Sequence, residues 1–416
     1  MSGALPRAAV VLSGNELLDG RTRDSNGAFL SADLSARGVK VTSVLTVADD
    51  EERLTAALQY SLAAEPDLLV VGGGLGTTHD DLTAACLARA LGVSLDEDAT
   101  ALGMVEERVR LVAERRHLDL AVLLPLARRQ ALLPAGSTAV LPAGVAPGIA
   151  ARRGPTRIYA YPGVPYEFEA MWLSTAERLQ AEGFFPDVVL RIVRIFGVGE
   201  LQVAPLLGAT SHDLLETGIN VGRGEVTVRL RYRRGAPADA QAAALVAALE
   251  TGAPVFSSDG RTVDDVVADG LREHGLTLAV AESCTGGLLG ARLTERPGSS
   301  AYFVGGVISY ADEVKMGLLA VPAGMLARYG AVSAEVAGAM AAGARAATGA
   351  DYALAVSGVA GPDGGSPDKP VGLVYVACDG PRRTNVVRGL YPGDRASVRE
   401  YSVSAALHLL RRELAG

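Results

Sequence analysis

The fold is best indicated by Leu276-Thr277-Leu278-Ala279-Val280-Ala281-Glu282-Ser283-Cys284-Thr285-Gly286-Gly287. Residues 276–281 have the length and apolar character of a buried strand, and residues 286–293 have the pattern of a helix. A tight turn joins them, so residues 283–285 are expected where a strand ends and a helix begins. Such a turn offers unpaired backbone N–H groups and exposed hydroxyls, which suit an oxyanion or a phosphate. A plain helix cap is the equally weighted alternative for Ser283 and Thr285.

Lys315 follows Ser283 by 32 positions. It is one of only three lysines among 39 basic residues, so its position is more informative than that of an arginine. A serine and a scarce lysine suggest a nucleophile and its general base. A lysine that acts as a base near neutral pH has to be buried and unpaired, and we expect this of Lys315. A solvated helix lysine beside Asp312 and Glu313 is the alternative.

Length and composition indicate a globular chain of more than one domain. The 416 residues exceed what one hydrophobic core usually serves, and 49% apolar residues with 49 glycines favour α/β layers joined by glycine turns. The net charge of -8 offers no general basic surface, so nucleic acid is an unlikely partner. No apolar run of about 18 residues predicts a membrane span.

The cysteines are few and widely spaced along the chain. Cys86, Cys284 and Cys378 indicate neither a disulfide framework nor a cysteine-rich zinc site. The N-terminus lacks a basic region followed by an apolar core of signal-peptide length. We therefore expect a cytoplasmic protein.

The periodicity of apolar residues divides the chain into three predicted domains. Residues 1–175 alternate short apolar runs with amphipathic stretches, which is typical of βαβ units and a mainly parallel sheet. Residues 187–257 follow a βαββαβ order, which predicts a small α+β domain. Residues 262–416 predict a compact α/β domain that begins with a helix and ends with one. The overall fold class is α/β.

The middle domain has one feature of RNA-binding modules. Arg229, Arg231 and Arg233 alternate along one face of a predicted strand. The segment lacks the Gly-x-x-Gly loop with which a KH module clamps backbone nucleotides. We interpret it as a KH-like structural or dimerisation domain.

Four further motifs in the last third of the chain follow the serine turn. They are Ser309-Tyr310-Ala311-Asp312-Glu313-Val314-Lys315, Ser357-Gly358-Val359-Ala360-Gly361-Pro362-Asp363-Gly364-Gly365, Lys369-Pro370-Val371-Gly372 and Gly393-Asp394-Arg395. Taken with the serine turn and in this order, they resemble the C-terminal domain of the CinA (competence/damage-inducible) family. The resemblance covers essentially all of residues 262–416.

The resemblance implies hydrolysis of the carboxamide of nicotinamide mononucleotide (NMN) to nicotinate mononucleotide and ammonia, without a cofactor at this site. In the mechanism we expect, Ser283 attacks the amide carbon, Lys315 takes its proton, and backbone N–H groups of the turn hold the oxyanion. Tyr310 is expected to orient the base or the substrate. The expected substrate-binding residues are Cys284, Thr285, Gly286, Gly287, Ser357, Gly358 and Arg395. The resemblance also implies a homodimer.

Several alternatives stay open at this site. Cys284 could replace Ser283 as nucleophile, although the region has no histidine except His274 and His408 to activate it. Arg395 is the expected ligand of the nucleotide phosphate, and a helix cap or a partner of the adjacent aspartate is its alternative role. Asp312 stands where the family commonly has Asn, which adds a negative charge close to Lys315.

A glycine-rich loop in the first domain also lies between a strand and a helix. Gly73, Gly74, Gly76 and Thr78 belong to this loop, where glycines allow close approach of a phosphate to the backbone. Asp80 and Asp81, which follow the loop, are candidate ligands of a hard divalent metal, with Asp49 or Asp50 as a further candidate. The alternative is that the loop binds nucleotide without turnover, or that its two aspartates only supply negative charge at a helix start.

The loop and neighbouring motifs resemble the molybdopterin-binding-like, three-layer N-terminal domain of CinA proteins. These motifs are residues 14–20, 146–148 and 162–167. Some relatives hydrolyse ADP-ribose with a divalent metal, so the resemblance implies a possible second activity. Asn15, Thr77 and Val145 depart from the usual Thr, Pro and Thr. The alternative hypothesis is that the protein is not an enzyme but a nucleotide-sensing accessory protein in competence or the DNA-damage response.

Overall fold

The computed structural model describes residues 5–208 and 214–415, and contacts divide the chain into two compact units. The first unit spans Met1–Val188 and the second spans Val189–Gly416. The second unit contains two separate sheets, which hold the predicted middle and C-terminal domains. The predicted domain limits at 175, 187, 257 and 262 stay predictions.

The first unit is built on a six-stranded sheet with the strand order β2-β1-β3-β8-β7-β6. The first four strands of this order run parallel, and β7 and β6 are antiparallel additions at one edge. The strands are β1 (Arg7–Ser13), β2 (Lys40–Val47), β3 (Leu68–Gly72), β6 (Thr138–Val140), β7 (Gly148–Arg153) and β8 (Thr156–Tyr161).

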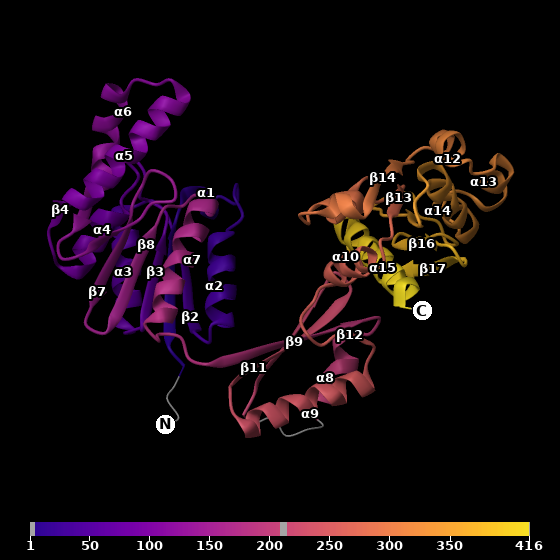
Figure 1. Cartoon of the computed structure of the whole chain (residues 1–416), viewed down its shortest axis with the longest axis horizontal. Helices are drawn as coiled ribbons and strands as arrows, with labels where there is room; N and C mark the ends of the chain where they lie inside the picture. Colours follow the sequence, from indigo (N-terminus) through magenta and orange to yellow (C-terminus); the bar gives the residue numbers. More distant parts are fainter. Residues whose placement is uncertain (1–4, 209–213, 416) are drawn as a thin grey trace. The chain divides into compact units, whose positions relative to one another are not determined.

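Helices cover both faces of this sheet and make three layers (Figure 1). Strand β3, and strand β1 apart from its exposed first residue Arg7, are buried and present apolar side chains to both helical layers, which accounts for their nearly continuous apolar sequences. One face packs on α2 (Asn26–Ala36) and α7 (Pro165–Ala181). The other packs on α3 (Glu51–Ala63), α4 (Thr83–Leu91) and α5 (Ala99–Arg116). The short helix α1 (Asn15–Leu18) follows β1 directly.

The segment between α4 and β8 contains more structure than its sequence indicates. It holds α5, α6 (Leu120–Ala127), a 3-10 turn (Arg128–Ala131), the two-stranded sheet β4 (Leu95–Glu97) and β5 (Leu132–Pro134), and strands β6 and β7. Three of these strands have only three residues, which is too short for an alternating pattern to stand out. The sequence analysis predicted none of these elements.

The second unit begins with a four-stranded sheet of order β10-β11-β9-β12, in which β10 pairs antiparallel with β11 and β9 pairs antiparallel with β12. Its elements follow the predicted βαββαβ order: β9 (Val188–Phe196), α8 (Glu200–Gly208), β10 (Glu216–Gly222), β11 (Glu225–Arg233), α9 (Ala236–Gly252) and β12 (Val255–Ser257). One face of the sheet packs on α8 and α9 around a small apolar core.

The second sheet of this unit has five strands in the order β14-β13-β15-β16-β17. The second strand of this order, β13, runs parallel to both of its neighbours, and the last two strands are antiparallel. The strands are β13 (Leu278–Glu282), β14 (Phe303–Ile308), β15 (Tyr352–Gly358), β16 (Leu373–Asp379) and β17 (Thr384–Leu390).

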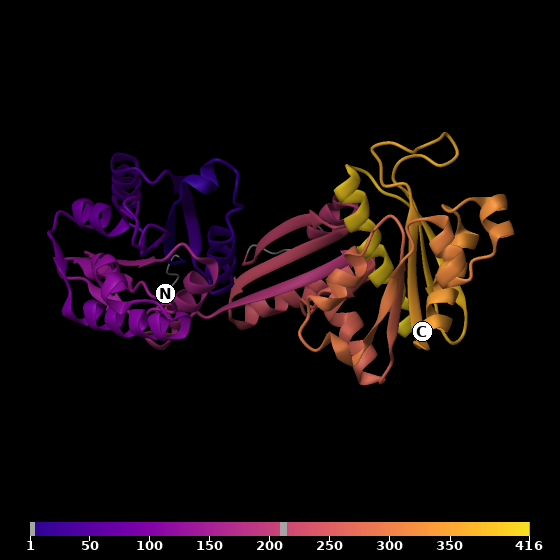
Figure 2. The same cartoon turned by 90° about the horizontal axis from the view of Figure 1, so that it is seen from above.

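Two helical layers enclose this five-stranded sheet (Figure 2). One layer consists of α10 (Val263–Glu273), α11 (Leu288–Thr294) and the long last helix α15 (Arg395–Ala415). The other consists of α12 (Asp312–Leu319), α13 (Ala323–Tyr329) and α14 (Ala334–Thr348). A short 3-10 turn (Ser299–Ala301) precedes β14. The segments after β13, β14 and β15 meet at one edge of the sheet, where parallel α/β sheets place their ligand sites.

Candidate functional site

The serine turn lies between the end of β13 at Glu282 and the start of α11 at Leu288. Gly286 and Gly287 have φ angles of 57° and 97°, a left-handed conformation that favours glycine. The Gly286 amide donates to the Ser283 carbonyl at 3.1 Å, which closes a four-residue turn. The Ser283 amide donates to Val356 O of β15 at 3.0 Å. These bonds anchor the partly exposed serine at the carboxyl end of β13.

The Glu282 carboxylate accepts hydrogen bonds from backbone amides at the N-terminus of α11. Its side chain is 1% exposed and accepts hydrogen bonds from the amides of Gly287 at 3.0 Å, Leu289 at 3.0 Å and Gly290 at 2.8 Å. A carboxylate in this position also interacts favourably with the positive end of the helix dipole. Glu282 belongs to the serine-turn motif, but no local sequence pattern indicates this role for it.

Two amides of the turn remain available. Within the described residues, the backbone N–H groups of Cys284 and Thr285 donate to no other residue, whereas those of Ser283 and of residues 286–290 all have acceptors. The two free amides directly follow Ser283. The expectation that amides of residues 284–287 hold an oxyanion therefore narrows to these two donors.

Cys284 is buried inside the turn and lacks the properties of a nucleophile. Burial raises the pKa of its thiol to about 11, despite the nearby positive charges of Arg395 and Arg399. At neutral pH the thiol is therefore protonated, and a thiol in this form reacts slowly. This observation favours Ser283 over Cys284.

Lys315 is buried, as expected, but it is not unpaired. The side chain is 1% exposed, and its Nζ donates to Ser309 O at 2.9 Å and Tyr310 O at 3.1 Å. Asp312 Oδ1 lies 3.5 Å from the same nitrogen, one helical turn away on α12. The prediction that Lys315 is unpaired is wrong, because the start of α12 brings the aspartate within ion-pair distance.

Lys315 nevertheless lies at the same sheet edge as the serine turn. The Ser309 amide, at the end of β14, donates to Glu282 O at 2.7 Å, and the Lys315 ammonium contacts the carbonyl of that same Ser309. Glu282 immediately precedes Ser283. The structure therefore connects the nucleophile candidate and Lys315 through one short hydrogen-bonded path.

Tyr310, Arg395 and Arg399 complete the edge of the serine turn. Arg395 donates to Gly361 O at 2.7 Å and to the hydroxyl of Tyr310 at 3.1 Å, and the Tyr310 side chain is 61% exposed. One turn further along α15, Arg399 donates to the Thr285 carbonyl through Nη2 at 2.6 Å and Nε at 3.2 Å. The sequence analysis missed Arg399, whose only signal was its spacing of four residues from Arg395, which places both on one helix face.

Ser357 and Gly358, two predicted substrate ligands, lie at the end of β15. Ser357 is fully buried and its hydroxyl donates to Ala331 O at 2.6 Å. A side chain at Gly358 would meet the backbone of the adjacent strand β16, with Leu373 O only 2.7 Å from an added Cβ. Both residues support the sheet edge in this structure, and their contact with substrate stays a prediction.

The glycine-rich loop of the first unit packs closely on its surroundings. A Cβ on Gly73 would lie 2.2 Å from Ser13 O, and one on Gly76 would lie 2.5 Å from the Asp81 carboxylate. Asp81 accepts hydrogen bonds from the amides of Gly76 at 2.7 Å and Thr78 at 2.8 Å, and from the Thr78 hydroxyl at 2.6 Å. Its carboxylate organises the loop in the way that Glu282 organises the serine turn.

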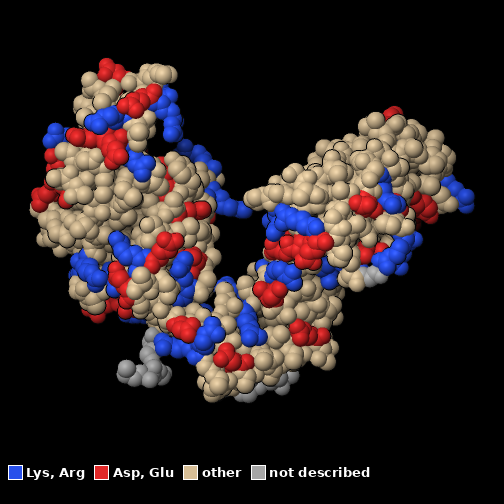
Figure 3. Space-filling model, in the orientation of Figure 1, with Lys and Arg blue, Asp and Glu red and all other residues tan. Residues whose placement is uncertain are grey.

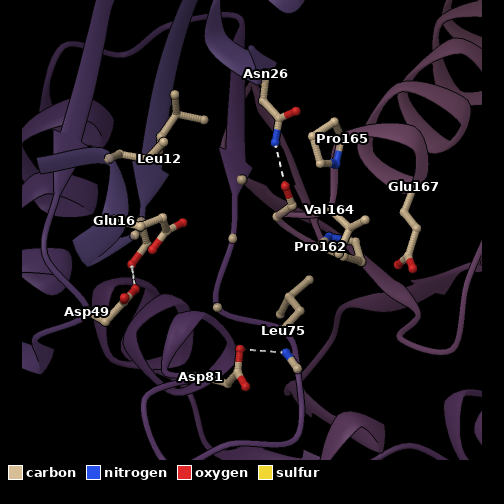
Figure 4. A pocket seen from close by; sticks show the side chains of 18 of the residues that line it. Leu12, Glu16, Asn26, Asp49, Leu75, Asp81, Pro162, Val164, Pro165 and Glu167 are labelled. Carbon is tan, nitrogen blue, oxygen red and sulfur yellow. Dashed lines mark hydrogen bonds between the residues drawn. The ribbon is translucent and has the colours of Figure 1, made fainter. Parts of the chain in front are cut away.

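A pocket with a volume of about 570 Å³ opens in front of this loop (Figure 4). Side chains from several elements surround it, including Glu16, Asn26, Asp49, Asp81 and Glu167. The amides of Gly74 and Leu75, which also line the pocket, have no acceptor among the described residues. The pocket therefore combines free backbone donors with several carboxylates.

The predicted metal ligands do not form a ready-made metal centre. The Asp49 carboxylate accepts from Ser13 Oγ at 2.5 Å and from the Asn15 amide at 3.0 Å, so both its oxygens are engaged. The pKa of the exposed Asp80 is lowered, mainly by a hydrogen bond from Thr78. In residues 5–208 and 214–415, no group of three or more His, Cys, Asp or Glu side chains is arranged to hold a metal ion.

The surface charge and the hydrophobicity of the helices agree with the predictions from the amino-acid composition. On the face seen in Figure 3, acidic side chains are interspersed among the basic ones, without a continuous basic surface. No helix among the described residues is both long and apolar enough to cross a bilayer. The three cysteines are free and buried.

Both units of the chain are similar to known protein families. Residues 260–414 match the family described as the CinA C-terminal domain, and residues 9–181 match the family described as a probable molybdopterin binding domain. A crystal structure of a competence-damaged protein (CinA) superfamily member from Klebsiella pneumoniae has 35% sequence identity. It covers 37% of this chain and 99% of its own, with a TM-score of 0.36.

Full-length relatives carry CinA names. A CinA-like protein of Mycobacterium sp. (strain JLS) is 40% identical over 98% of this chain and 99% of its own length. A CinA-like protein of Citrifermentans bemidjiense is 42% identical over 98% and 97%, respectively. A putative competence-damage inducible protein of Moorella thermoacetica is 40% identical over 98% and 99%. With these relatives and both matching domains, the chain belongs to the CinA family.

Proposed function

We propose that the C-terminal domain hydrolyses the carboxamide of NMN to nicotinate mononucleotide and ammonia. The observation that carries the proposal is the pair of free amides at Cys284 and Thr285, which follow a partly exposed serine. Amide hydrolysis passes through a tetrahedral oxyanion, and two adjacent backbone donors next to a nucleophile are suited to hold it. Removing one such donor typically costs a factor of about 100 to 1000 in kcat.

The proposed reaction has two steps. The Ser283 hydroxyl adds to the amide carbon, its proton leaves with the departing ammonia, and an ester forms between the serine and the nicotinoyl group. Water then attacks the ester carbonyl and releases nicotinate mononucleotide and the free serine. The same two amides hold the oxyanion in each step.

Lys315 is the proposed carrier of the proton. In the resting structure its ammonium donates to two carbonyls and faces Asp312, so it has to release a proton before it can accept one from Ser283. The short path from Lys315 through Ser309 to Glu282 supports this role. Asp312 opposes it, because its carboxylate competes with Ser283 for the Lys315 side chain.

Arg395 and Tyr310 are the proposed contacts for the rest of the nucleotide. Arg395 is exposed, and two of its five N–H groups have acceptors in the structure, so donors remain for a phosphate. The exposed ring of Tyr310 beside it offers a surface on which an aromatic substrate ring can stack.

Ammonia release from NMN by the purified chain tests this proposal. We expect Ser283→Ala to lower the rate at least about 1000-fold. Ser300→Ala, at an exposed serine of the same unit, is the matched control and should leave the rate unchanged. Ammonia release that survives Ser283→Ala would rule out the serine mechanism. Absence of turnover by the unmodified protein, with NMN binding retained in calorimetry, would favour the nucleotide-sensing accessory protein.

For the N-terminal domain we propose nucleotide binding in the pocket before the glycine-rich loop. The free amides of Gly74 and Leu75 suit a phosphate, and the volume of about 570 Å³ falls within the usual range of small-molecule sites. The engaged carboxylates of Asp49 and Asp81 support binding more directly than metal-dependent hydrolysis of ADP-ribose.

Calorimetry with ADP-ribose, with and without divalent metal, tests the binding proposal, and product analysis in the same samples tests turnover. Binding without products would assign a ligand-sensing role to this pocket. Products that form only with metal would support the pyrophosphatase. No binding under either condition would contradict the proposal.

A further inference from the structure

Arg399 and the serine turn are joined by an unbroken chain of hydrogen bonds. The Arg399 guanidinium donates twice to the Thr285 carbonyl, at 2.6 and 3.2 Å. That carbonyl shares its peptide group with the Gly286 amide, which donates to the Ser283 carbonyl at 3.1 Å. The Ser283 carbonyl in turn shares its peptide group with the Cys284 amide, one of the two free donors.

The direction of each bond in this chain is the same. Positive charge on Arg399 draws electron density towards Thr285 O, which makes the Gly286 N–H a stronger donor. The strengthened bond then polarises the next peptide group and makes the Cys284 N–H a stronger donor as well. Such chains strengthen each bond by roughly 10 to 30%.

The surroundings favour this effect. Thr285 is fully buried and Arg399 is half-buried, so water screens the charge less than it does at an open surface. Glu282 holds the far end of the turn through Gly287, so the turn cannot easily rotate away from Arg399. Two opposite charges thus fix one turn from its two sides.

We propose that Arg399 is a positioning residue that polarises the Cys284 amide through two peptide groups, and thereby strengthens the oxyanion hole; its catalytic consequence rests on the proposed amide hydrolysis. Arg399 does not contact the reacting atoms. It acts on a donor that matters most when negative charge develops, so its loss should affect kcat rather than KM.

Charge-selective substitutions test the kinetic part. Arg399→Lys keeps the charge, and Arg399→Gln keeps an N–H donor but removes the charge. We expect Arg399→Gln to lower kcat on the order of tenfold with KM within about twofold, and Arg399→Lys to retain most of kcat. Equal kcat for the two variants, or a change confined to KM, would overturn the proposal. Arg412→Gln, on the exposed side of the same helix, is the matched control.

A spectroscopic readout tests the relay without any turnover. The chain has only three cysteines, so selective ¹⁵N-cysteine labelling of the full protein gives three amide signals, and Cys284→Ser assigns the relevant one. We expect the Cys284 amide proton to move upfield in Arg399→Gln, to move much less in Arg399→Lys, and to stay in place in Arg412→Gln. An unmoved signal in Arg399→Gln would overturn the relay even if NMN is hydrolysed. An absence of NMN turnover with a moved signal would overturn the proposed function instead.

Discussion

The two strand-to-helix loops of this protein have the same local design but different surroundings. In each, glycines allow a tight path and one carboxylate collects backbone amides: Glu282 in the serine turn and Asp81 in the glycine-rich loop. The serine turn has a partly exposed serine, the proposed nucleophile, beside two free amides, whereas the glycine-rich loop faces a pocket of about 570 Å³. The difference teaches that a glycine-rich turn supplies donors, and that its neighbours decide between covalent chemistry and binding.

Removing the carboxylate of the serine turn should have the largest effect. Glu282→Ala leaves three amides of a buried helix start without an acceptor, so we expect a loss of about 3 kcal/mol in the free energy of unfolding of the second unit. The distorted turn should also lower kcat for ammonia release about 100-fold. Urea unfolding followed by circular dichroism measures the first effect. Stability within about 0.5 kcal/mol of the unmodified protein would show that Glu282 does not organise the turn.

The corresponding change in the glycine-rich loop should cost less. Asp81 is partly exposed, so water can replace it after Asp81→Ala, and we expect a loss of about 1 kcal/mol in the first unit. The only tryptophan, Trp172, lies in α7 of that unit and reports its unfolding by fluorescence. Ammonia release from NMN should not change. A loss as large as that of Glu282→Ala would remove the distinction between the two loops.

These carboxylates also show what the sequence can and cannot reveal. The strand, turn and helix around Ser283 follow from apolar periodicity and glycines, and the predicted alternation of apolar runs and amphipathic stretches in residues 1–175 corresponds to strands alternating with helices α2, α3 and α4. The hydrogen-bond partners of the Glu282 side chain cannot be predicted in this way, because they depend on the geometry of the turn. That geometry is set by hydrogen bonds to other strands. Arg399 reaches the turn from a helix that begins more than 100 residues later, and no local pattern encodes such a contact.

The pairing of Lys315 marks a further limit. Burial of Lys315 was predictable from its proposed role, but its contact with Asp312 depends on where α12 begins, and a helix at Lys315 was considered only in the alternative of a solvated lysine. The segment between α4 and β8 was missed for a related reason, since its strands are too short to show a period. Local patterns define long elements, and tertiary contacts define the rest.

A substitution at Asp312 should have a moderate effect, and it tests the proposed role of Lys315 beside the serine turn. Its side chain is 51% exposed and contributes a screened interaction of about 0.2 to 1 kcal/mol with Lys315. Asp312→Asn removes the carboxylate that competes with Ser283 for the Lys315 side chain, so we expect kcat/KM for NMN at pH 7 to rise about threefold. Glu313→Gln on the same helix is the control. A fall in kcat/KM would argue that Asp312 assists catalysis and that Lys315 is not the base.

The smallest expected effect concerns the pH dependence of the second unit. His408 on α15 is fully buried, stacks on Phe196 and lies 2.9 Å from the Glu225 carboxylate, with no partner for Nδ1 among the described residues. Burial lowers the pKa of His408, and the nearby Arg411 and Arg292 charges add to this, while Glu225 opposes it.

The unfolded chain therefore binds a proton at His408 below about pH 6.5, whereas the folded chain resists it. Stability of the second unit should be greatest above that pH and should fall as the pH decreases below it. His408→Gln keeps a donor for Glu225 and should flatten this part of the profile in urea unfolding. An unchanged slope in the variant would assign the acid sensitivity to other groups.

The central claim is that Ser283 forms an ester with the nicotinoyl group beside the two free amides. Rapid quenching of the protein with NMN, followed by peptide mass spectrometry, tests it most directly. The account predicts that the peptide containing Ser283 gains the mass of NMN minus ammonia, and that Ser283→Ala shows no such gain. A modified Cys284, or ammonia release from NMN with no modified peptide at any quench time, would contradict it.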